Sequence, residues 1–195
     1  WVPGDRIVLE RNERYRHGPA FSPNKGPAHF QRMIFRIIPE DATMTAEVTS
    51  GNVDITFDVT PSGLQQLRGN PNVTVMQAPT YSVQYLVMNM ERWMFQNAKV
   101  RQAIAHSIDK EAIARAAWLG VGRPVEGLIN QATIGFWPGV RQYSYAYDVA
   151  RAKTLFAEAG WRPGPDGILR KDNDRFEVTL ITFSNIDQWR RAGVI

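Results

Sequence analysis

The chain has 195 residues, of which 44% are hydrophobic and 22% charged, ordinary proportions for a soluble globular protein. No apolar run approaches the roughly 20 residues that a membrane-spanning helix needs, and residues 1–5 lack the pattern of a signal peptide. The net charge is +4 with a pI near 9.6, but the basic residues are scattered, which disfavours a nucleic-acid-binding face. The absence of cysteine excludes disulfides, thiolate metal sites and cysteine nucleophiles.

The first predicted elements are strands. Alternating apolar side chains predict a strand over residues 6–12, and an apolar, β-branched run predicts another over residues 32–38. Residues 15–27 are rich in Gly, Pro, Ser and Asn and are predicted to form a loop.

A short helix is predicted next. Asp41 can cap a helix over residues 42–50, which Gly51 can end in the left-handed conformation. A third strand over residues 53–57 completes a strand–helix–strand order, which predicts a parallel strand pair with a right-handed crossover.

Thr60 and Pro61 supply a cap and a first helical residue for a helix over residues 62–68. Two more strands are predicted over residues 73–77 and 81–89.

The character of the sequence then changes to helix-rich. Asn97, Asp109 and Asp148 each stand where they can cap a helix with apolar residues at helical spacing. Gly120 and Gly160 mark the ends of the second and third of these helices. A strand over residues 176–183 and a helix over residues 187–195 follow. We therefore expect a division into residues 1–92 and 93–195.

The predicted elements at the two ends begin and stop abruptly. Trp1 lies directly before a predicted strand, and the last helix lacks a capping residue. The sequence therefore predicts an internal stretch of a longer protein.

Catalytic constellations are absent from the sequence pattern. His17, His29 and His106 do not stand at metal-ligand spacing, and His106 is predicted to be a solvated residue of its helix surface. Asp54 and Asp58 are four residues apart and would share a face if both lay on the strand, where paired carboxylates can act as acid and base. The favoured interpretation is structural, with Asp58 at the strand end and Asp54 bonded to nearby backbone donors. No phosphate-binding glycine loop, serine-hydrolase motif or zinc motif is present. We expect no catalytic residue, no metal ligand and no cofactor.

Aromatic residues gather in or beside irregular segments, mainly within residues 121–147. They line a ligand cleft in one interpretation, because aromatic side chains offer a large contact area to a ligand. In the other interpretation they form a small satellite core under a long loop. Both alternatives stay open for Trp93, Phe95, Phe136, Trp137, Tyr143 and Tyr145.

Short patterns along nearly the whole chain resemble, in the same order, the family-5 solute-binding proteins of ABC transporters. The clearest is Val100-Arg101-Gln102-Ala103-Ile104 followed by Ile108-Asp109-Lys110, which is similar to the family's V-R-Q-A-I and I-D-R stretch. The Gly and Asp residues of these patterns fall at predicted helix ends and starts. The matching stretches are residues 1–15, 50–55, 85–89, 100–113, 120–125 and 147–160.

This resemblance implies an α/β chain that is a fragment of a two-lobed periplasmic-binding-protein-like fold, the type II peptide-binding class. Residues 1–92 are then part of the first α/β lobe and residues 93–195 the start of the second. The implied function is not enzymatic: the protein binds peptides or similarly sized solutes between the lobes and delivers them to a membrane permease. A periplasmic or extracytoplasmic location, with or without a lipid anchor, a monomeric state and no nucleic-acid partner are implied as well.

The resemblance also suggests ligand-binding residues. In oligopeptide binders the Asn end of the strand matching residues 81–89 approaches the ligand backbone, which implies Tyr85, Asn89 and Met90. The loop after residues 176–183 presents an arginine in dipeptide-binding relatives, but here it is short and starts with Ser184 and Asn185, without arginine. The aromatic segment adds Trp137 to a predicted set of Tyr85, Asn89, Met90, Trp137, Ser184 and Asn185.

The ligand and the wider role stay open. Peptides, sugar oligomers, opines and metal chelates all bind to this scaffold in related proteins. A second class of function is the ligand-sensing domain of a regulatory protein, and a third is a hydrolase, which the missing catalytic constellation disfavours.

Overall fold

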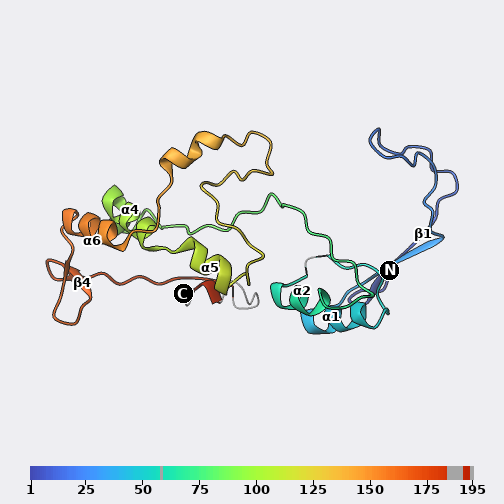
Figure 1. Cartoon of the computed structure of the whole chain (residues 1–195), viewed down its shortest axis with the longest axis horizontal. Helices are drawn as coiled ribbons and strands as arrows, with labels where there is room; N and C mark the ends of the chain where they lie inside the picture. Colours follow the sequence, from blue (N-terminus) through green and yellow to red (C-terminus); the bar gives the residue numbers. More distant parts are fainter. Residues whose placement is uncertain (58, 184–190, 194–195) are drawn as a thin grey trace. The chain divides into compact units, whose positions relative to one another are not determined.

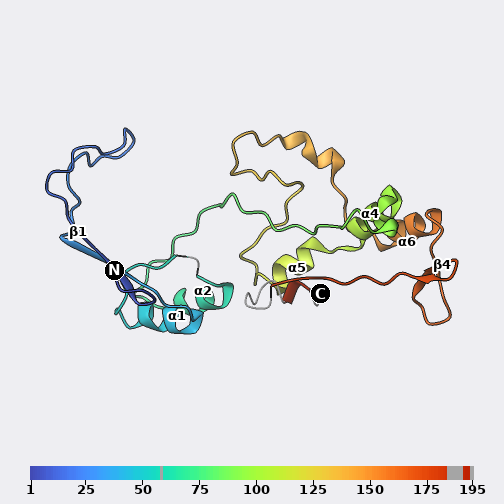
Figure 2. The ribbon, with the colours of Figure 1, turned by 180° about the vertical axis from the view of Figure 1, so that it is seen from behind.

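The computed structural model describes residues 1–57, 59–183 and 191–193, and it divides into two compact units, residues 1–75 and 76–195 (Figure 1). Figure 2 shows the elements of both units from behind. In the described part of the chain, every helix is too short or too polar to cross a membrane. The assignment of residues 1–92 and 93–195 to two lobes stays a prediction.

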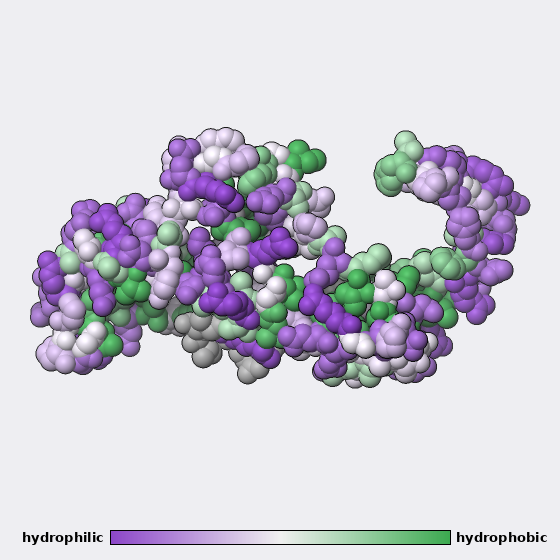
Figure 3. Space-filling model, viewed as in Figure 1, coloured by the Kyte–Doolittle hydropathy of each residue, from purple (hydrophilic) through white to green (hydrophobic). Residues whose placement is uncertain are grey.

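The first unit contains a two-stranded antiparallel ribbon. Strand β1 (Arg6–Glu10) pairs with β2 (Arg32–Arg36), with Arg6 opposite Arg36 and Glu10 opposite Arg32. Because side chains alternate along a strand, one face of the ribbon is wholly apolar. Its residues are 39–50% exposed, and apolar residues are visible on the molecular surface (Figure 3). These residues are Ile7, Leu9, Met33 and Phe35.

Two short helices, α1 (Asp41–Thr49) and α2 (Pro61–Leu67), pack together in the same unit. Leu64 and Leu67 of α2 are buried. The helices approach closely at Thr45 and Gly63, where a β-carbon on residue 63 would lie 2.8 Å from Thr45 Oγ1. Glycine at this position therefore sets how near the two helices come.

Among the described residues of the second unit, the regular structure is mainly helical, with a small antiparallel sheet in the order β3–β4–β5. Its elements are α3 (Trp93–Gln96), α4 (Ala98–Ser107), α5 (Lys110–Ala116), the 3-10 helix η1 (Pro138–Tyr143), α6 (Val149–Glu158), β3 (Arg162–Pro163), β4 (Leu169–Lys171) and β5 (Asp174–Arg175).

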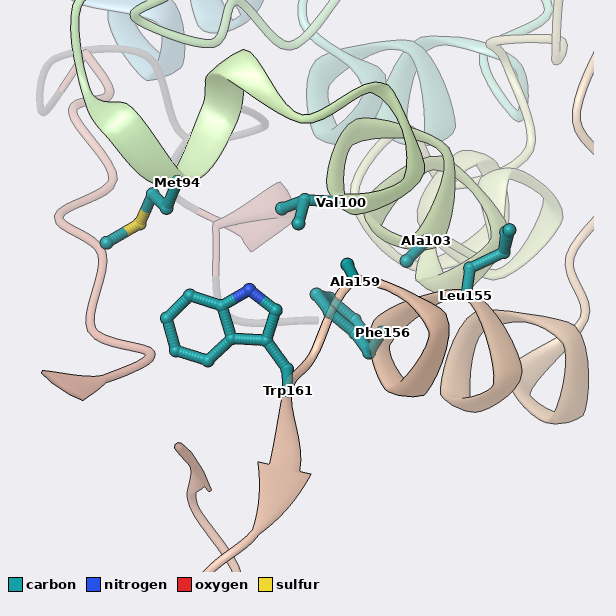
Figure 4. Close-up of a cluster of buried hydrophobic side chains, with 7 residues drawn as sticks. All are labelled: Met94, Val100, Ala103, Leu155, Phe156, Ala159 and Trp161. Carbon is teal, nitrogen blue, oxygen red and sulfur yellow. The ribbon is translucent and has the colours of Figure 1, made fainter. Parts of the chain in front are cut away.

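The core of the second unit lies between α4 and α6 (Figure 4). Trp161 follows α6 and is 1% exposed. Its ring stacks on Trp93 at 5.5 Å and meets Phe176 edge-on at 4.9 Å. Burial of aromatic and aliphatic surface is the main stabilising contribution here. The buried cluster comprises Met94, Val100, Ala103, Leu155, Phe156, Ala159 and Trp161.

The capping residues predicted for four helices are confirmed. The Asn97, Asp109 and Asp148 side chains accept backbone N–H bonds of 2.8–2.9 Å at the starts of α4, α5 and α6, and Thr60 accepts one of 3.3 Å from Gly63. Gly51, at +76°, has the predicted left-handed φ. Asp41 differs from the prediction, because it is the first residue of α1 and Glu40 occupies the cap position.

The predicted parallel pairing of residues 32–38 with residues 53–57 is wrong for the described residues, because residues 53–57 form no strand and β2 pairs with β1 in antiparallel orientation. In all, four predicted strands are absent from the described part of the chain, although their sequences alternate suitably. A strand needs a neighbour for its N–H and C=O groups, and the described strands form no ladder with these segments, although the N–H of Phe176 bonds the carbonyl oxygen of Leu169 in β4. The segments are residues 53–57, 73–77, 81–89 and 176–183. The predicted helix over residues 187–195 lies largely outside the described residues.

Candidate functional site

Three of the predicted ligand-binding residues lie together on the segment that leads into α3. Tyr85 and Met90 are 61% and 48% exposed, and Asn89 is exposed as well. The Asn89 side-chain oxygen accepts a 2.9 Å hydrogen bond from the N–H of Glu91, and its carbonyl oxygen accepts one of 3.1 Å from Arg92. Asn89 therefore closes a turn ahead of α3, a local structural role, while Tyr85 and Met90 keep apolar surface available for contacts.

Trp137 lies directly before η1 and is 56% exposed. Its ring faces Tyr143, at the other end of η1, with centroids 6.3 Å apart and planes inclined at 41°. Tyr143 is 67% exposed, so these two rings form an aromatic pair on the surface of the second unit. The 3-10 helix positions the pair, because Pro138 fixes the backbone at its first residue.

Two other aromatic residues contribute to the core instead. Trp93 stacks on Trp161, and Phe95 packs against the buried cluster between α4 and α6. For these two residues the structure supports the satellite-core alternative over the cleft alternative.

Tyr145 contacts His106, whose ring lies edge-on to it at 5.4 Å. His106 is half-buried, and its Nδ1 is 2.7 Å from the carbonyl oxygen of Ala146, a contact that the prediction of a solvated surface histidine did not include. The cause is the segment before α6, which folds back over the end of α4. A single sequence holds no local signal for this contact, since forty residues separate its partners.

The predicted set is only partly assembled. Ser184 and Asn185 lie outside the described residues. Within the described part of the chain, no hydrogen bond or ring contact connects Trp137 with Tyr85, Asn89 or Met90.

The second unit carries the net positive charge of the chain, with 15 Lys and Arg residues against 11 Asp and Glu residues and hence +4. Two of its carboxylates form ion pairs with basic side chains. The Lys99 ammonium, 2.9 Å from Glu158, lowers the pKa of that carboxyl, and the Arg170 guanidinium, 3.1 Å from Asp166, does the same there. Arg141 is an exposed residue of η1 and stands between Trp137 and Tyr143 in the sequence.

Other candidate chemistry is weak. No group of three or more His, Cys, Asp or Glu side chains suited to a metal ion occurs among the described residues. The first unit has an open depression lined by Glu10, Arg11, Glu13, Gln31 and Arg32, which the sequence interpretation missed. Its charges neutralise each other in two ion pairs, Arg11–Glu13 at 2.6 Å and Arg32–Glu10 at 3.7 Å. The depression therefore presents no unbalanced charge to a ligand.

Comparison with known proteins gives a match along the whole sequence. The family described as bacterial extracellular solute-binding proteins, family 5 middle, matches residues 1–195. Heme-binding protein A of Haemophilus influenzae is 29% identical over 88% of this chain and 30% of its own length. The probable D,D-dipeptide-binding periplasmic protein DdpA of Escherichia coli is 28% identical over 100% of this chain and 36% of its own length.

Solved structures agree in fold. The oligopeptide-binding protein AppA of Bacillus subtilis, solved with a nonapeptide, is similar at a TM-score of 0.64 and 26% identity over 90% of this chain and 33% of its own. NikZ of Campylobacter jejuni, solved with Ni(L-His), gives a TM-score of 0.72 at 22% identity over 100% and 37% of the two chains. These likenesses confirm the predicted fold class. The chain spans about a third of the length of these relatives.

Proposed function

Because this chain belongs to the bacterial extracellular solute-binding proteins of family 5, we propose that it is part of the solute-binding component of an ABC importer. The observation that carries the proposal is the family match along all 195 residues. The protein acts by binding and not by catalysis, in keeping with relatives that are named as binding proteins. It works outside the cytoplasm, as a monomer with a membrane permease and without nucleic acid.

The proposed solute is a peptide or a molecule of similar size. Peptide binding is supported by the names of AppA and DdpA, and by the nonapeptide in the AppA structure. A non-peptide solute is the second candidate, because heme-binding protein A is 29% identical to this chain and NikZ was solved with Ni(L-His). Exposed aromatic and apolar side chains at Tyr85, Met90 and Trp137 suit either solute.

We assign residues 1–92 to the first lobe and residues 93–195 to the second lobe of the proposed binding protein. In this arrangement the solute binds more tightly to the closed state and shifts the population toward it. Tyr85, Asn89, Met90, Trp137, Ser184 and Asn185 are its proposed contacts on this chain.

The experiment is mass spectrometry of the small molecules that co-purify with the full-length protein, released by mild denaturation. Peptides recovered in stoichiometric amounts are the expected result. A heme or metal chelate recovered in their place would favour the second candidate, and turnover of added peptides would contradict a role limited to binding. A matched purification of an unrelated protein with the same tag identifies background molecules.

A further inference from the structure

The aromatic pair has an unusual neighbour in Gly139, the second residue of η1. A β-carbon on residue 139 would lie 2.7 Å from Cη2 of the Trp137 indole, and nearer still to Cζ2 and Cε2. Real β-carbons do not approach other atoms this closely. The indole of Trp137 therefore occupies the space that any other residue at position 139 would fill.

The backbone alone does not demand glycine here. The φ angle of Gly139 lies outside the left-handed region that disfavours other residues. The three nearest atoms that a β-carbon would meet belong to the Trp137 side chain. A β-carbon at position 139 would therefore displace the Trp137 indole and leave the backbone turn unchanged.

The position of the indole decides what the pair presents to its surroundings. Folded back over the turn, the ring faces Tyr143 at a centroid distance of 6.3 Å, while both side chains stay more than half exposed. Tryptophan and tyrosine have only two side-chain torsions, so holding them in place costs little conformational entropy. A fixed, exposed aromatic pair suits stacking against a flat partner.

We propose that Gly139 is a positioning residue, which holds Trp137 beside Tyr143 as a platform for an aromatic or other planar group of the bound solute. The proposal rests on the solute-binding function proposed above. Gly139 makes no contact with the solute itself and acts through the orientation of the indole.

Three variants of the full-length protein separate this role from a general effect on stability. Gly139→Ala adds the β-carbon, Trp137→Ala removes the ring, and the double variant has both changes. Gly69→Ala is the matched control, because a β-carbon at residue 69 meets nothing within 4 Å and its φ is also outside the left-handed region.

Binding is measured by calorimetry with the tripeptides Ala-Phe-Ala and Ala-Tyr-Ala, and with Ala-Ala-Ala as the non-aromatic probe. We expect Gly139→Ala to weaken binding of the aromatic tripeptides roughly three- to tenfold, the range of aromatic pair energies, and to leave Ala-Ala-Ala unchanged. The loss should equal that of Trp137→Ala, and the double variant should lose no more. Additive losses, or equal losses for all three tripeptides, would overturn the proposal.

A second readout does not depend on peptide binding. In protein labelled with 5-fluorotryptophan, the fluorine resonance of Trp137 is identified by its loss in Trp137→Phe. We expect Gly139→Ala to shift this resonance without ligand, while Gly69→Ala does not. Millimolar N-acetyltyrosinamide should shift it in the wild-type protein and not in Gly139→Ala.

The two readouts distinguish failure of the platform from failure of the proposed function. If no tripeptide binds but N-acetyltyrosinamide still shifts the Trp137 resonance, peptide binding is wrong and the platform stands for a solute of another class. If the resonance responds neither to Gly139→Ala nor to N-acetyltyrosinamide, the platform is wrong even where the protein binds peptides.

Discussion

The two units of this chain differ in how they bury apolar residues. In residues 1–75 the ribbon of β1 and β2 leaves its apolar face 39–50% exposed, and a two-stranded ribbon has no second layer of its own to cover that face. In residues 76–195, α4 and α6 enclose a core around Trp161, which is 1% exposed. Helices complete their backbone hydrogen bonds within themselves, whereas a sheet depends on neighbouring strands.

The units also differ in charge. Residues 1–75 contain 8 Lys and Arg and 8 Asp and Glu residues and are neutral, so the whole net charge of +4 lies in residues 76–195. The second unit thus combines the better core, the positive charge and the exposed aromatic pair. The well-buried core and the candidate binding residues therefore lie in the same part of the chain.

The largest expected effect tests the core of the second unit. Trp161→Ala removes a fully buried ring that contacts Trp93 and Phe176, and such truncations cost about 3–5 kcal/mol of unfolding free energy. Hydrogen exchange measured by mass spectrometry should show faster exchange in α4 and α6 and unchanged exchange in α1 and α2. Equal acceleration in α1 and α2 would contradict an effect confined to the second unit.

A smaller effect is expected in the first unit. Gly63→Ala places a β-carbon 2.8 Å from Thr45 Oγ1 and 3.1 Å from Val59 Cγ1, and overpacking of this kind costs about 1–3 kcal/mol. Hydrogen exchange should accelerate in α1 and α2 only. Gly69→Ala, where the β-carbon meets open space, is the control, and Thr45→Ala in the Gly63→Ala background should restore part of the loss.

The smallest effect concerns acid sensitivity. The Lys99 ammonium holds the pKa of Glu158 below its ordinary value of 4.5, so the stabilisation from this pair is complete above that pH and is lost as the pH falls through the lowered pKa. Between about pH 6 and about pH 3, Glu158→Gln should therefore lose less stability than the wild-type protein.

Urea unfolding followed by tryptophan fluorescence measures the second unit, which holds five of the six tryptophans. The corresponding pair in the first unit, Glu47 with Arg36, provides a control, since Glu47→Gln should leave this signal unchanged. An identical pH response of Glu158→Gln and the wild-type protein would show that the Lys99–Glu158 pair contributes nothing measurable.

Local signals explain what could be predicted. Asn97, Asp109 and Asp148 mark helix starts because their side chains bond N–H groups only two or three residues away. Alternation over residues 81–89 and 176–183 suggested strands, but pairing depends on partners distant in sequence, which no local pattern specifies.

The candidate site likewise has features that the local sequence predicts and features that depend on residues distant in the sequence. Trp137 was recognisable as an aromatic residue in an irregular segment, whereas its dependence on Gly139 appears only when the turn brings the indole over the backbone. The link between His106 and Ala146 was not predictable, because it depends on tertiary folding across forty residues.

That link also fixes the tautomer of His106. A carbonyl oxygen can only accept a hydrogen bond, so Nδ1 must carry the proton that reaches Ala146 at 2.7 Å. In the neutral ring, Nε2 is then left with its lone pair. The imidazole thus has one preferred tautomer, set by the backbone just ahead of α6, and in the neutral ring its second nitrogen is a hydrogen-bond acceptor.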